Sequence, residues 1–372
     1  MSDAGLYLHV PFCLRKCPYC DFYSGAFSPD AAQAYTDAAV RNLGAYGAQL
    51  SQRAFDTIYF GGGTPSLLSF SQVEQILAAA YAHLRVRSPE ITLEVNPAAH
   101  APNQLLALRT IGVNRLSIGV QSFDTAELAL LGRLHDAASA QATIRAAQAA
   151  GFENLSCDLI LGLAGQTQET LLTSAARLVG AGVPHISAYL LKIEPGTPFA
   201  QRGEAAVSAD ADTQADLYEA LADFLEAAGY RHYEISNFAL PGFESRHNLK
   251  YWRGADYLGI GPSAHSFLNG RRFYVPSSAD AFLRAPVQQE ETEEAQVVAH
   301  EEYILLGLRL AEGISFARLD ALGGNARLLE ERARRFLSAD LARRTAEGIA
   351  LTRAGFLLSN TVIGALLVGE NY

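Results

Sequence analysis

The feature that most constrains the fold of this chain is the regular alternation of short β-rich runs with helical stretches in its first half. β-Branched, leucine and aromatic residues gather in six runs, at Leu6–Val10, Thr57–Phe60, Ile91–Val95, Arg115–Val120, Leu155–Leu161 and His185–Leu191. Alanine- and leucine-rich stretches with helical spacing lie between the runs, at residues 30–50, 71–84, 103–111, 138–150 and 168–181. Parallel strands need a crossover connection, which is usually a helix. The pattern therefore predicts six parallel βα units.

Six units are too few to close an eight-stranded barrel, so we expect an α/β protein built on a partial (β/α)6 barrel over residues 1–205. In such barrels ligands bind at the carboxyl ends of the strands. We therefore look for functional residues directly after each predicted strand.

The pattern changes after about residue 205. A long helix is expected at 210–228, followed by a strand at His232–Ile235 and a loop region rich in glycine, asparagine and proline to about residue 278. We take residues 206–290 as a connecting region. We take residues 291–372 as a smaller, mainly helical, winged-helix-like domain, with helices at 293–310, 315–321 and 325–346, a strand at Ile349–Thr352 and a last helix.

Charge and apolar patterning exclude some functional classes. The 372-residue chain has a net charge of −10 and an acidic run at Glu290, Glu291, Glu293 and Glu294, which disfavours binding to nucleic acid. No basic, apolar leader is present, and the most apolar runs, such as Ile363–Val368, are too short for a transmembrane segment. We therefore expect a cytoplasmic protein.

Three of the four cysteines lie within eight residues, directly after the first predicted strand, as Cys13, Cys17 and Cys20. Clustered thiols in a reducing compartment indicate a metal site or redox chemistry, because a disulfide framework is not expected there. A C-x3-C-x2-C loop holds three irons of a [4Fe–4S] cluster and leaves the fourth open to a cofactor. The alternative is a zinc site with His9 as the fourth ligand. Cys157 stands alone in an apolar run, and we expect it to be a buried core thiol.

The segment from Tyr7 to Cys20 resembles the opening of radical S-adenosylmethionine (SAM) proteins of the oxygen-independent coproporphyrinogen III oxidase group. The resemblance continues over nearly the whole chain, through Phe60–Pro65 (FGGGTP), Glu94–Pro97 (EVNP), Ser117–Ser122 (SIGVQS), Asp158–Thr167 (DLILGLAGQT) and Glu194–Thr197 (EPGT). It implies a [4Fe–4S] cluster and bound SAM. One departure is Ala164, which stands where the family usually has proline.

By this resemblance, a set of polar and aromatic residues at the strand ends would contact SAM: Tyr7, Tyr19, Gly62, Gly63, Thr64, Glu94, Gln121, Arg133, Asp158 and the backbone at Lys192. Chemically the set supplies donors for a carboxylate, acceptors for an amine and ribose hydroxyls, and an aromatic face. Glycines at 61–63 would let backbone amides approach the ligand closely.

Two departures separate the chain from the oxidases of this group. The oxidases carry a further cysteine two residues after the third ligand, where this chain has Phe22, and they carry an N-terminal extension, where only 12 residues precede Cys13. In addition, His247-Asn-Leu-Lys-Tyr-Trp252 resembles a heme-associated HNxxYW motif of heme chaperones related to the oxidases. The resemblance implies heme contacts at His247, Asn248, Tyr251 and Trp252. Histidine is a common iron ligand, and the aromatic residues would stack on the macrocycle.

The function that we expect is therefore that of a heme chaperone, which binds heme and transfers it to an acceptor hemoprotein. The alternative is an oxygen-independent coproporphyrinogen III dehydrogenase. The only methionine is Met1 and no C-x-x-C-H is present, so a protein ligand to heme iron would be a histidine, a tyrosine or Cys157. His265, in the segment GIGPSAH, is a second candidate ligand beside His247.

Overall fold

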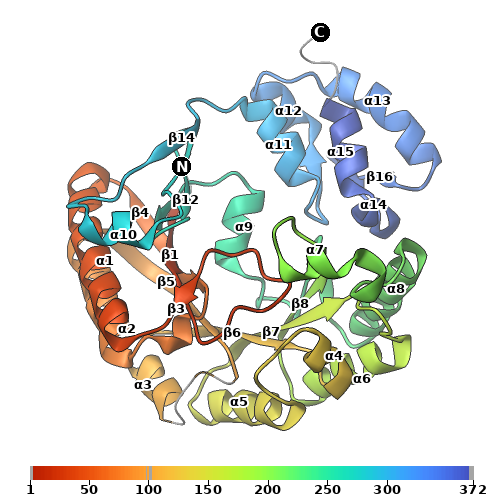
Figure 1. The fold of residues 1–372 in the computed structure, drawn as a ribbon. Helices are drawn as coiled ribbons and strands as arrows, with labels where there is room; N and C mark the ends of the chain where they lie inside the picture. The colour runs from red at the N-terminus through yellow and green to blue at the C-terminus, as the bar shows by residue number, and fades with distance from the viewer. Residues whose placement is uncertain (1–2, 98, 100–102, 368–372) are drawn as a thin grey trace.

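The computed structural model describes residues 3–97, 99 and 103–367, and Figure 1 shows their arrangement. The predicted strands are present as β1 (Ala4–Val10), β4 (Ala54–Gly62), β5 (Arg85–Val95), β6 (Arg115–Gln121), β7 (Asn154–Leu161) and β8 (His185–Leu190). The helices between them are α1 (Pro29–Leu50), α2 (Phe70–His83), α3 (Gln104–Thr110), α5 (Ala137–Ala149) and α6 (Gln168–Gly180). The six strands lie side by side and parallel in the order β1-β4-β5-β6-β7-β8, which confirms the partial barrel.

Side-chain hydrogen bonds cap the first turn of several helices. Ser28 caps α1, which has proline at its first position. Ser69 and Gln72 form a reciprocal capping box at α2, and Thr167 and Thr170 form one at α6. The α4 helix (Thr125–Leu130), which the pattern did not predict, begins at the side chain of Asp124.

A seventh parallel strand, β11 (Tyr257–Ile260), pairs with β1, with Leu8 opposite Ile260. The expectation of a loop region to about residue 278 was wrong, because that stretch contains β11, α9 (Arg246–Trp252), β12 (His265–Leu268) and β13 (Arg271–Tyr274). All three strands are hydrogen-bonded into the main sheet. The sheet ends in antiparallel strands on both sides: β12, β13 and β14 (Glu291–Glu294) next to β11, and β10 (Asn237–Ala239) and β9 (Arg231–Glu234) next to β8.

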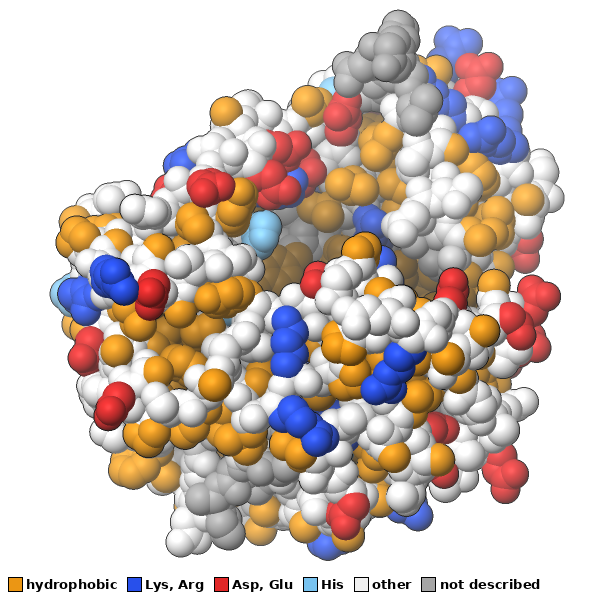
Figure 2. All heavy atoms as spheres, viewed as in Figure 1, with side chains coloured by type: hydrophobic (Ala, Val, Ile, Leu, Met, Phe, Trp, Pro, Cys, Tyr) orange, Lys and Arg blue, Asp and Glu red, His pale blue; other side chains and the backbone are white. Residues whose placement is uncertain are grey.

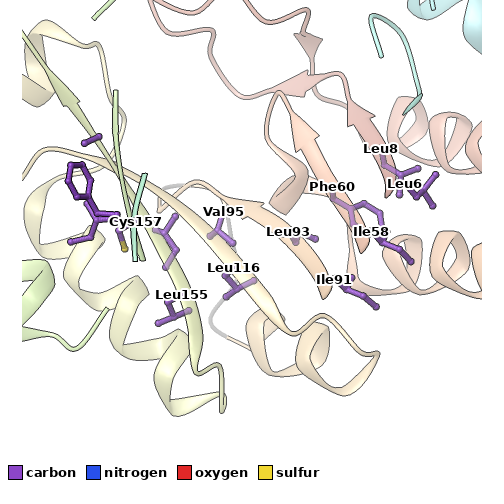
Figure 3. Packing of buried hydrophobic residues seen from close by; sticks show 14 of the residues in the cluster. Leu6, Leu8, Ile58, Phe60, Ile91, Leu93, Val95, Leu116, Leu155 and Cys157 are labelled. Atoms are coloured by element: carbon purple, nitrogen blue, oxygen red, sulfur yellow. The ribbon is translucent and has the colours of Figure 1, made fainter. Parts of the chain in front are cut away.

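The strands alternate between an apolar outer face and a polar inner face. Figure 3 shows the outer face, where Leu6, Leu8, Ile58, Phe60, Ile91, Leu93, Val95, Leu116 and Leu155 pack in one core beneath the helices. Cys157 lies in the same core and is fully buried, as predicted. The register places Tyr7 beside Tyr59 and Glu94 beside Ser117 on the other face. The interior of the barrel is therefore lined by side chains that can bind a polar ligand.

After the 17-residue helix α8 (Ala211–Ala227), the C-terminal region folds into helices around a small sheet. It contains α11 (Ala299–Gly307), β15 (Ile314–Ser315), α12 (Phe316–Ala321), α13 (Ala326–Ser338), β16 (Ala342–Arg344), β17 (Gly348–Leu351), α14 (Arg353–Leu357) and α15 (Ser359–Leu367). The mainly helical, winged-helix-like character is as predicted. Two predicted helices are shorter, because residues 291–294 pair with β13 as a strand and α13 ends before β16.

Short elements complete the described chain: β2 (Phe12–Cys13) and β3 (Gly25–Ala26), which pair with each other, the 3-10 turns at Pro65–Leu67 and Glu204–Ala206, α7 (Pro198–Arg202) and α10 (Ala279–Arg284). Two residues of the acidic run contact arginines of the same molecule: Arg271 contacts Glu290, and Arg272 contacts Glu294 and also Glu302 on α11. Within the described ranges, no helix is both long and apolar enough to cross a membrane.

Candidate cluster and cofactor site

The cysteine loop leaves the carboxyl end of β1 and lies over the mouth of the barrel, where Figure 1 draws it in red. Backbone hydrogen bonds fix it there: Gly63 donates to the Val10 carbonyl (2.9 Å) and Phe199 donates to the Pro18 carbonyl (3.0 Å). The Arg15 guanidinium donates to the Gly132 carbonyl at 2.6 Å. Three segments of the barrel therefore hold the loop in place.

Cys13, Cys17 and Cys20 are free thiols, partly buried, and all three line one cavity. Two polar side chains donate toward the sulfurs: Thr64 toward Cys13 (3.5 Å) and Arg133 toward Cys17 (3.4 Å). Burial raises the pKa of the Cys20 thiol, and the neighbouring sulfurs add to the effect. The two donors favour the thiolate forms of Cys13 and Cys17, in which cysteine binds iron, and three thiols on one loop suit a cluster with three cysteine ligands.

His9, the fourth ligand of the zinc alternative, has both ring nitrogens occupied. Its Nδ1 is 3.2 Å from the Tyr7 hydroxyl and its Nε2 is 2.8 Å from the Tyr23 carbonyl, and the side chain is buried. In the described part of the chain, no three cysteine, histidine or acidic side chains lie close enough to share a single metal ion. A cubane does not require this, because each thiolate binds a different iron.

Below the loop lies a cavity of about 390 Å3, within the size range of small-molecule sites. All of the residues predicted to contact SAM line it except Tyr7: they are Tyr19, Gly62, Gly63, Thr64, Glu94, Gln121, Arg133, Asp158 and Lys192. Tyr7 lies on the inner face of β1, bonded to His9 and close to Tyr59. The structure thus brings strand ends from across the sequence to one site.

Several lining residues were missed by the sequence prediction: Arg15, Phe22, Asn96, Ser117 and Tyr189. Asn96 and Ser117 belong to motifs that the resemblance had quoted, EVNP and SIGVQS. Tyr189 pairs with Ile160 across β8 and β7 and shares the inner face with Asp158. The sequence signal that could have identified Tyr189 was the alternation of side chains along β8, because residues two apart, such as Ser187 and Tyr189, lie on the same face of a strand.

Two partly buried carboxyl groups face the cavity, and both have raised pKa values. The pKa of Glu94 is raised to about 8, first by burial and then by repulsion from Asp158, although Tyr59 donates to its Oε1 at 3.0 Å. Burial raises the pKa of Asp158 to about 6. A cationic ligand would lower both values, since an opposite charge favours the ionised carboxylate. The pair therefore fits a ligand that carries an amine.

Arg133 brings a complementary charge to the same cavity. Its Nη2 donates to the Gly119 carbonyl at 2.9 Å, and its Nη1 lies 3.5 Å from the Tyr19 hydroxyl. Its Nε is buried and has no hydrogen-bond partner among the described residues. Because the Arg133 side chain lines the cavity, its positive charge favours an anionic ligand group such as a carboxylate. Cationic and anionic groups of one zwitterion thus both find partners.

The glycines of FGGGTP have a steric role. A Cβ on Gly63 would lie 2.5 Å from the Phe12 carbonyl oxygen, and one on Gly62, whose φ is +106°, would lie 2.7 Å from the His9 ring. The turn after β4 can therefore reach the cysteine loop only without side chains. In the GLAGQT loop, Gln166 accepts from the Gly162 amide at 2.8 Å, so a side chain fixes the loop in which Ala164 replaces the usual proline.

The HNxxYW segment forms α9, a helix at the amino-terminal end of the barrel, on the opposite side from the cysteine loop. Glu90 accepts from the backbone amides of His247 (3.1 Å) and Arg246 (3.3 Å) at its first turn. Lys250 bonds the Asp3 carbonyl (2.6 Å) and lies 2.5 Å from Asp56. The helix is therefore attached to the starts of β1, β4 and β5.

His247 points into the barrel and is only 1% exposed. Its Nδ1 bonds Thr57 and its Nε2 bonds Tyr251, each at 2.8 Å, and burial lowers its pKa to about 3. Trp252 is partly exposed and lies under the Arg309 guanidinium, 5.9 Å from its ring. Asn248 and Tyr251 are also partly exposed. His265 begins β12 at the other end of the barrel.

Comparisons with known proteins show similarity in both sequence and fold. The family model of the radical SAM superfamily matches residues 7–178. The heme chaperone HemW of Lactococcus lactis is 33% identical over 98% of this chain and 97% of its own length, and that of Mycobacterium tuberculosis is 37% identical over 98% and 94%. The Escherichia coli coproporphyrinogen III oxidase, described as a radical SAM enzyme, superposes with a TM-score of 0.85 over 98% of this chain and 90% of its own, at 21% identity. That last likeness is one of fold.

Proposed function

The chain belongs to the HemW family of radical SAM proteins, and from that membership we propose that it binds heme and transfers it to an acceptor hemoprotein. The observation that carries the proposal is the similarity to proteins named heme chaperone HemW, which covers 98% of this chain and nearly all of theirs. Membership of the radical SAM superfamily also implies the cofactors of that superfamily, a [4Fe–4S] cluster and SAM.

In this proposal Cys13, Cys17 and Cys20 hold the cluster. When bound, the cluster would supply an open iron at which SAM binds by its own atoms. Glu94 and Asp158 would bind the cationic groups of SAM, and Arg133 its carboxylate. Thr64 and Arg133 would donate to the cysteine sulfurs and so stabilise the thiolates.

The predicted heme contacts on α9 stay a prediction, and the arrangement supports them unequally. Asn248, Tyr251 and Trp252 are partly exposed. His247 is buried and both of its ring nitrogens are bonded, so iron binding there would first have to break a contact with Thr57 or Tyr251. The segment is better suited to supply aromatic contacts than the iron ligand.

Titration of the purified chain with ferric heme tests the proposal, followed by addition of apomyoglobin as a general acceptor. We expect a Soret band that differs from that of free heme, and then its conversion to that of myoglobin. The titration is run before and after anaerobic cluster reconstitution, which separates heme binding from cluster binding. A native chain without a heme band under either condition would contradict the proposal.

The same preparation also tests the alternative function, that of the coproporphyrinogen III dehydrogenase. With cluster, SAM, a reductant and coproporphyrinogen III, an oxidase would produce protoporphyrinogen IX. We expect none, because the position two residues after Cys20, where the oxidases have cysteine, holds Phe22, whose side chain is 65% exposed at the cavity. Steady formation of the product would favour the dehydrogenase instead.

A further inference from the structure

A histidine outside the HNxxYW segment lies at the end of the barrel where the cysteines are. His265 follows β11 by a short turn, and β11 runs parallel to β1 with Ile260 opposite Leu8. The carboxyl ends of both strands therefore lie together, and β1 leads directly to Cys13. His265 is also close enough to His9 for its charge to disfavour protonation of His9, whose pKa is lowered first by burial.

The turn that presents His265 is fixed by backbone contacts. Gly261 has a φ of +114°, its amide donates to Gln288 at 3.2 Å, and a Cβ there would lie 2.4 Å from the His9 carbonyl oxygen. Ser263 has a φ of +66°, which is uncommon for a residue other than glycine, and its amide donates to the Val275 carbonyl at 3.0 Å. Backbone held in a sparsely populated region is typical of ligand sites.

One face of the His265 ring packs against another side chain, and one of its ring nitrogens has no hydrogen bond within the described chain. It stacks on Tyr274, with ring centroids 5.5 Å apart and planes 28° apart, and Tyr274 donates to Glu291 at 2.5 Å. Nδ1 of His265 lies 3.6 Å from the Glu293 carboxylate, and the side chain is 53% exposed. No hydrogen bond joins Nε2 of His265 to another residue in the described part of the chain.

This arrangement matches what metal-binding histidines need. A carboxylate next to one ring nitrogen can hold the proton on that nitrogen, which leaves the lone pair of the other nitrogen for a metal. Here Glu293 faces Nδ1, so Nε2 is the nitrogen left for a ligand. The stack on Tyr274 fixes the plane of the ring.

Six of the other seven histidines of the described chain are less suited, and the seventh, His300, lies on α11 among the C-terminal helices. Both ring nitrogens are bonded in His9, His185 and His247. His232 is stacked on Phe238 and bonds Tyr218, and His135 bonds the Val120 carbonyl from a buried position. His83 is exposed on α2, a helix on the outer face of the barrel.

The surroundings at this end of the barrel also suit a flat apolar ligand. Figure 2 shows a hollow between the barrel and the C-terminal helices, with apolar side chains on its floor and acidic and histidine side chains at its rim. Phe22 and Tyr189, which are 65% and 43% exposed, lie at the same end of the barrel, in the lining of the cavity under the cysteine loop, whereas His265 lies outside that lining. Exposed aromatic side chains provide stacking surfaces for a macrocycle.

We propose that His265 is the axial ligand to heme iron through Nε2, with Glu293 as the residue that orients it. This inference rests on the proposed heme binding and assigns its iron ligand to β12 rather than to α9. It places the heme at the cluster end of the barrel.

Heme titrations of the native chain and of His265→Ala, Glu293→Gln and His83→Ala test it by visible spectroscopy. We expect His265→Ala to lose the ligand-dependent Soret band, and added imidazole to restore it by filling the vacated position. Glu293→Gln keeps the band but weakens heme binding by roughly tenfold, as expected for a group that orients a metal ligand. His83→Ala, also an exposed histidine, should bind heme like the native chain.

The outcomes separate this inference from the proposed function. If the native chain binds heme and His265→Ala keeps both affinity and spectrum, the ligand assignment is wrong and the chaperone function stands. A spectral change in His247→Gln alone would assign the ligand to α9. If the native chain binds no heme, both fail. Because His265 is exposed, circular dichroism should show a folded variant.

Discussion

The ring of Tyr59 stacks on that of His247, with centroids 5.0 Å apart and planes 30° apart, while the Tyr59 hydroxyl donates to Glu94. The histidine of the HNxxYW segment is therefore separated by a single residue, Tyr59, from a carboxyl group of the cavity below the cysteine loop. His247 also bonds Tyr251 near the carboxyl end of α9, and the next residue, Trp252, lies under the Arg309 guanidinium. The segment is thus part of the barrel interior and its connection to the C-terminal helices.

This position predicts that His247→Ala destabilises the protein. The substitution leaves the hydroxyls of Thr57 and Tyr251 without their partner inside the barrel and removes the surface on which Tyr59 rests. A buried polar group left unpaired costs about 1–3 kcal/mol, so we expect the free energy of unfolding to fall by about 3 kcal/mol in total. Chemical denaturation of the apo chain measures it.

The matched control for that measurement is His83→Ala, which removes an exposed histidine and should change stability by less than about 0.5 kcal/mol. SAM binding supplies a second readout, because Tyr59 should no longer be held against Glu94. Equal stability of the two variants, with unchanged SAM affinity, would show that the α9 contacts are unimportant.

The cysteine loop predicts about four irons per chain after anaerobic reconstitution, as a single cubane requires. Cys13→Ala, Cys17→Ala and Cys20→Ala should each abolish the cluster absorbance, because each removes one of three ligands. Cys157→Ala is the control, since that thiol is fully buried in the outer core. Retention of a full iron content by any of the first three variants would refute the assignment.

An ion-pair cluster predicts salt-dependent docking of the C-terminal helices. Arg353 on α14 donates to Glu219 (3.1 Å) and Glu226 (2.7 Å) on α8 and also contacts Asp223. We expect Arg353→Ala to lower the free energy of unfolding by about 1 kcal/mol at low salt, and by less in 1 M salt, because screening weakens such pairs. Arg284→Ala, which breaks an exposed pair with Asp280, should have almost no effect. A salt-independent loss would indicate lost packing instead.

The sequence predicted the six barrel strands well, because each is a buried β-rich run of four or more residues followed by a turn. It did not predict β11, whose four residues stand between glycine-containing turns. Its partner β1 lies some 250 residues earlier in the chain, so the pairing is not visible in local pattern. The sequence also did not predict α9, which has only seven residues and is capped at its amino terminus by Ser245.

The residues that line the cavity could be predicted, because the fold brings strand ends together and the quoted motifs lie at strand ends. The surroundings of His247 could not, since its partners Thr57 and Glu90 come from two other strands and carry no signal of that contact. The sequence identified His265 only as a candidate ligand that follows a glycine-containing segment. Its partners on β13 and β14 follow only from the strand pairing.

Glu94 predicts a pH dependence of both stability and SAM binding. Its pKa rises from the ordinary 4.5 to about 8 in the folded chain, so between these values the folded state holds a proton that the unfolded state releases. The contribution of Glu94 to stability is therefore most favourable below about pH 4.5 and falls as pH rises toward 8, and Glu94→Gln should remove that decline. SAM affinity should change in the opposite direction and rise between pH 6 and 8, because the cationic ligand binds the ionised carboxylate. Calorimetric titration at pH 6, 7 and 8 checks this, with the exposed Glu74→Gln as control, and a flat native profile would show that Glu94 does not bind the amine.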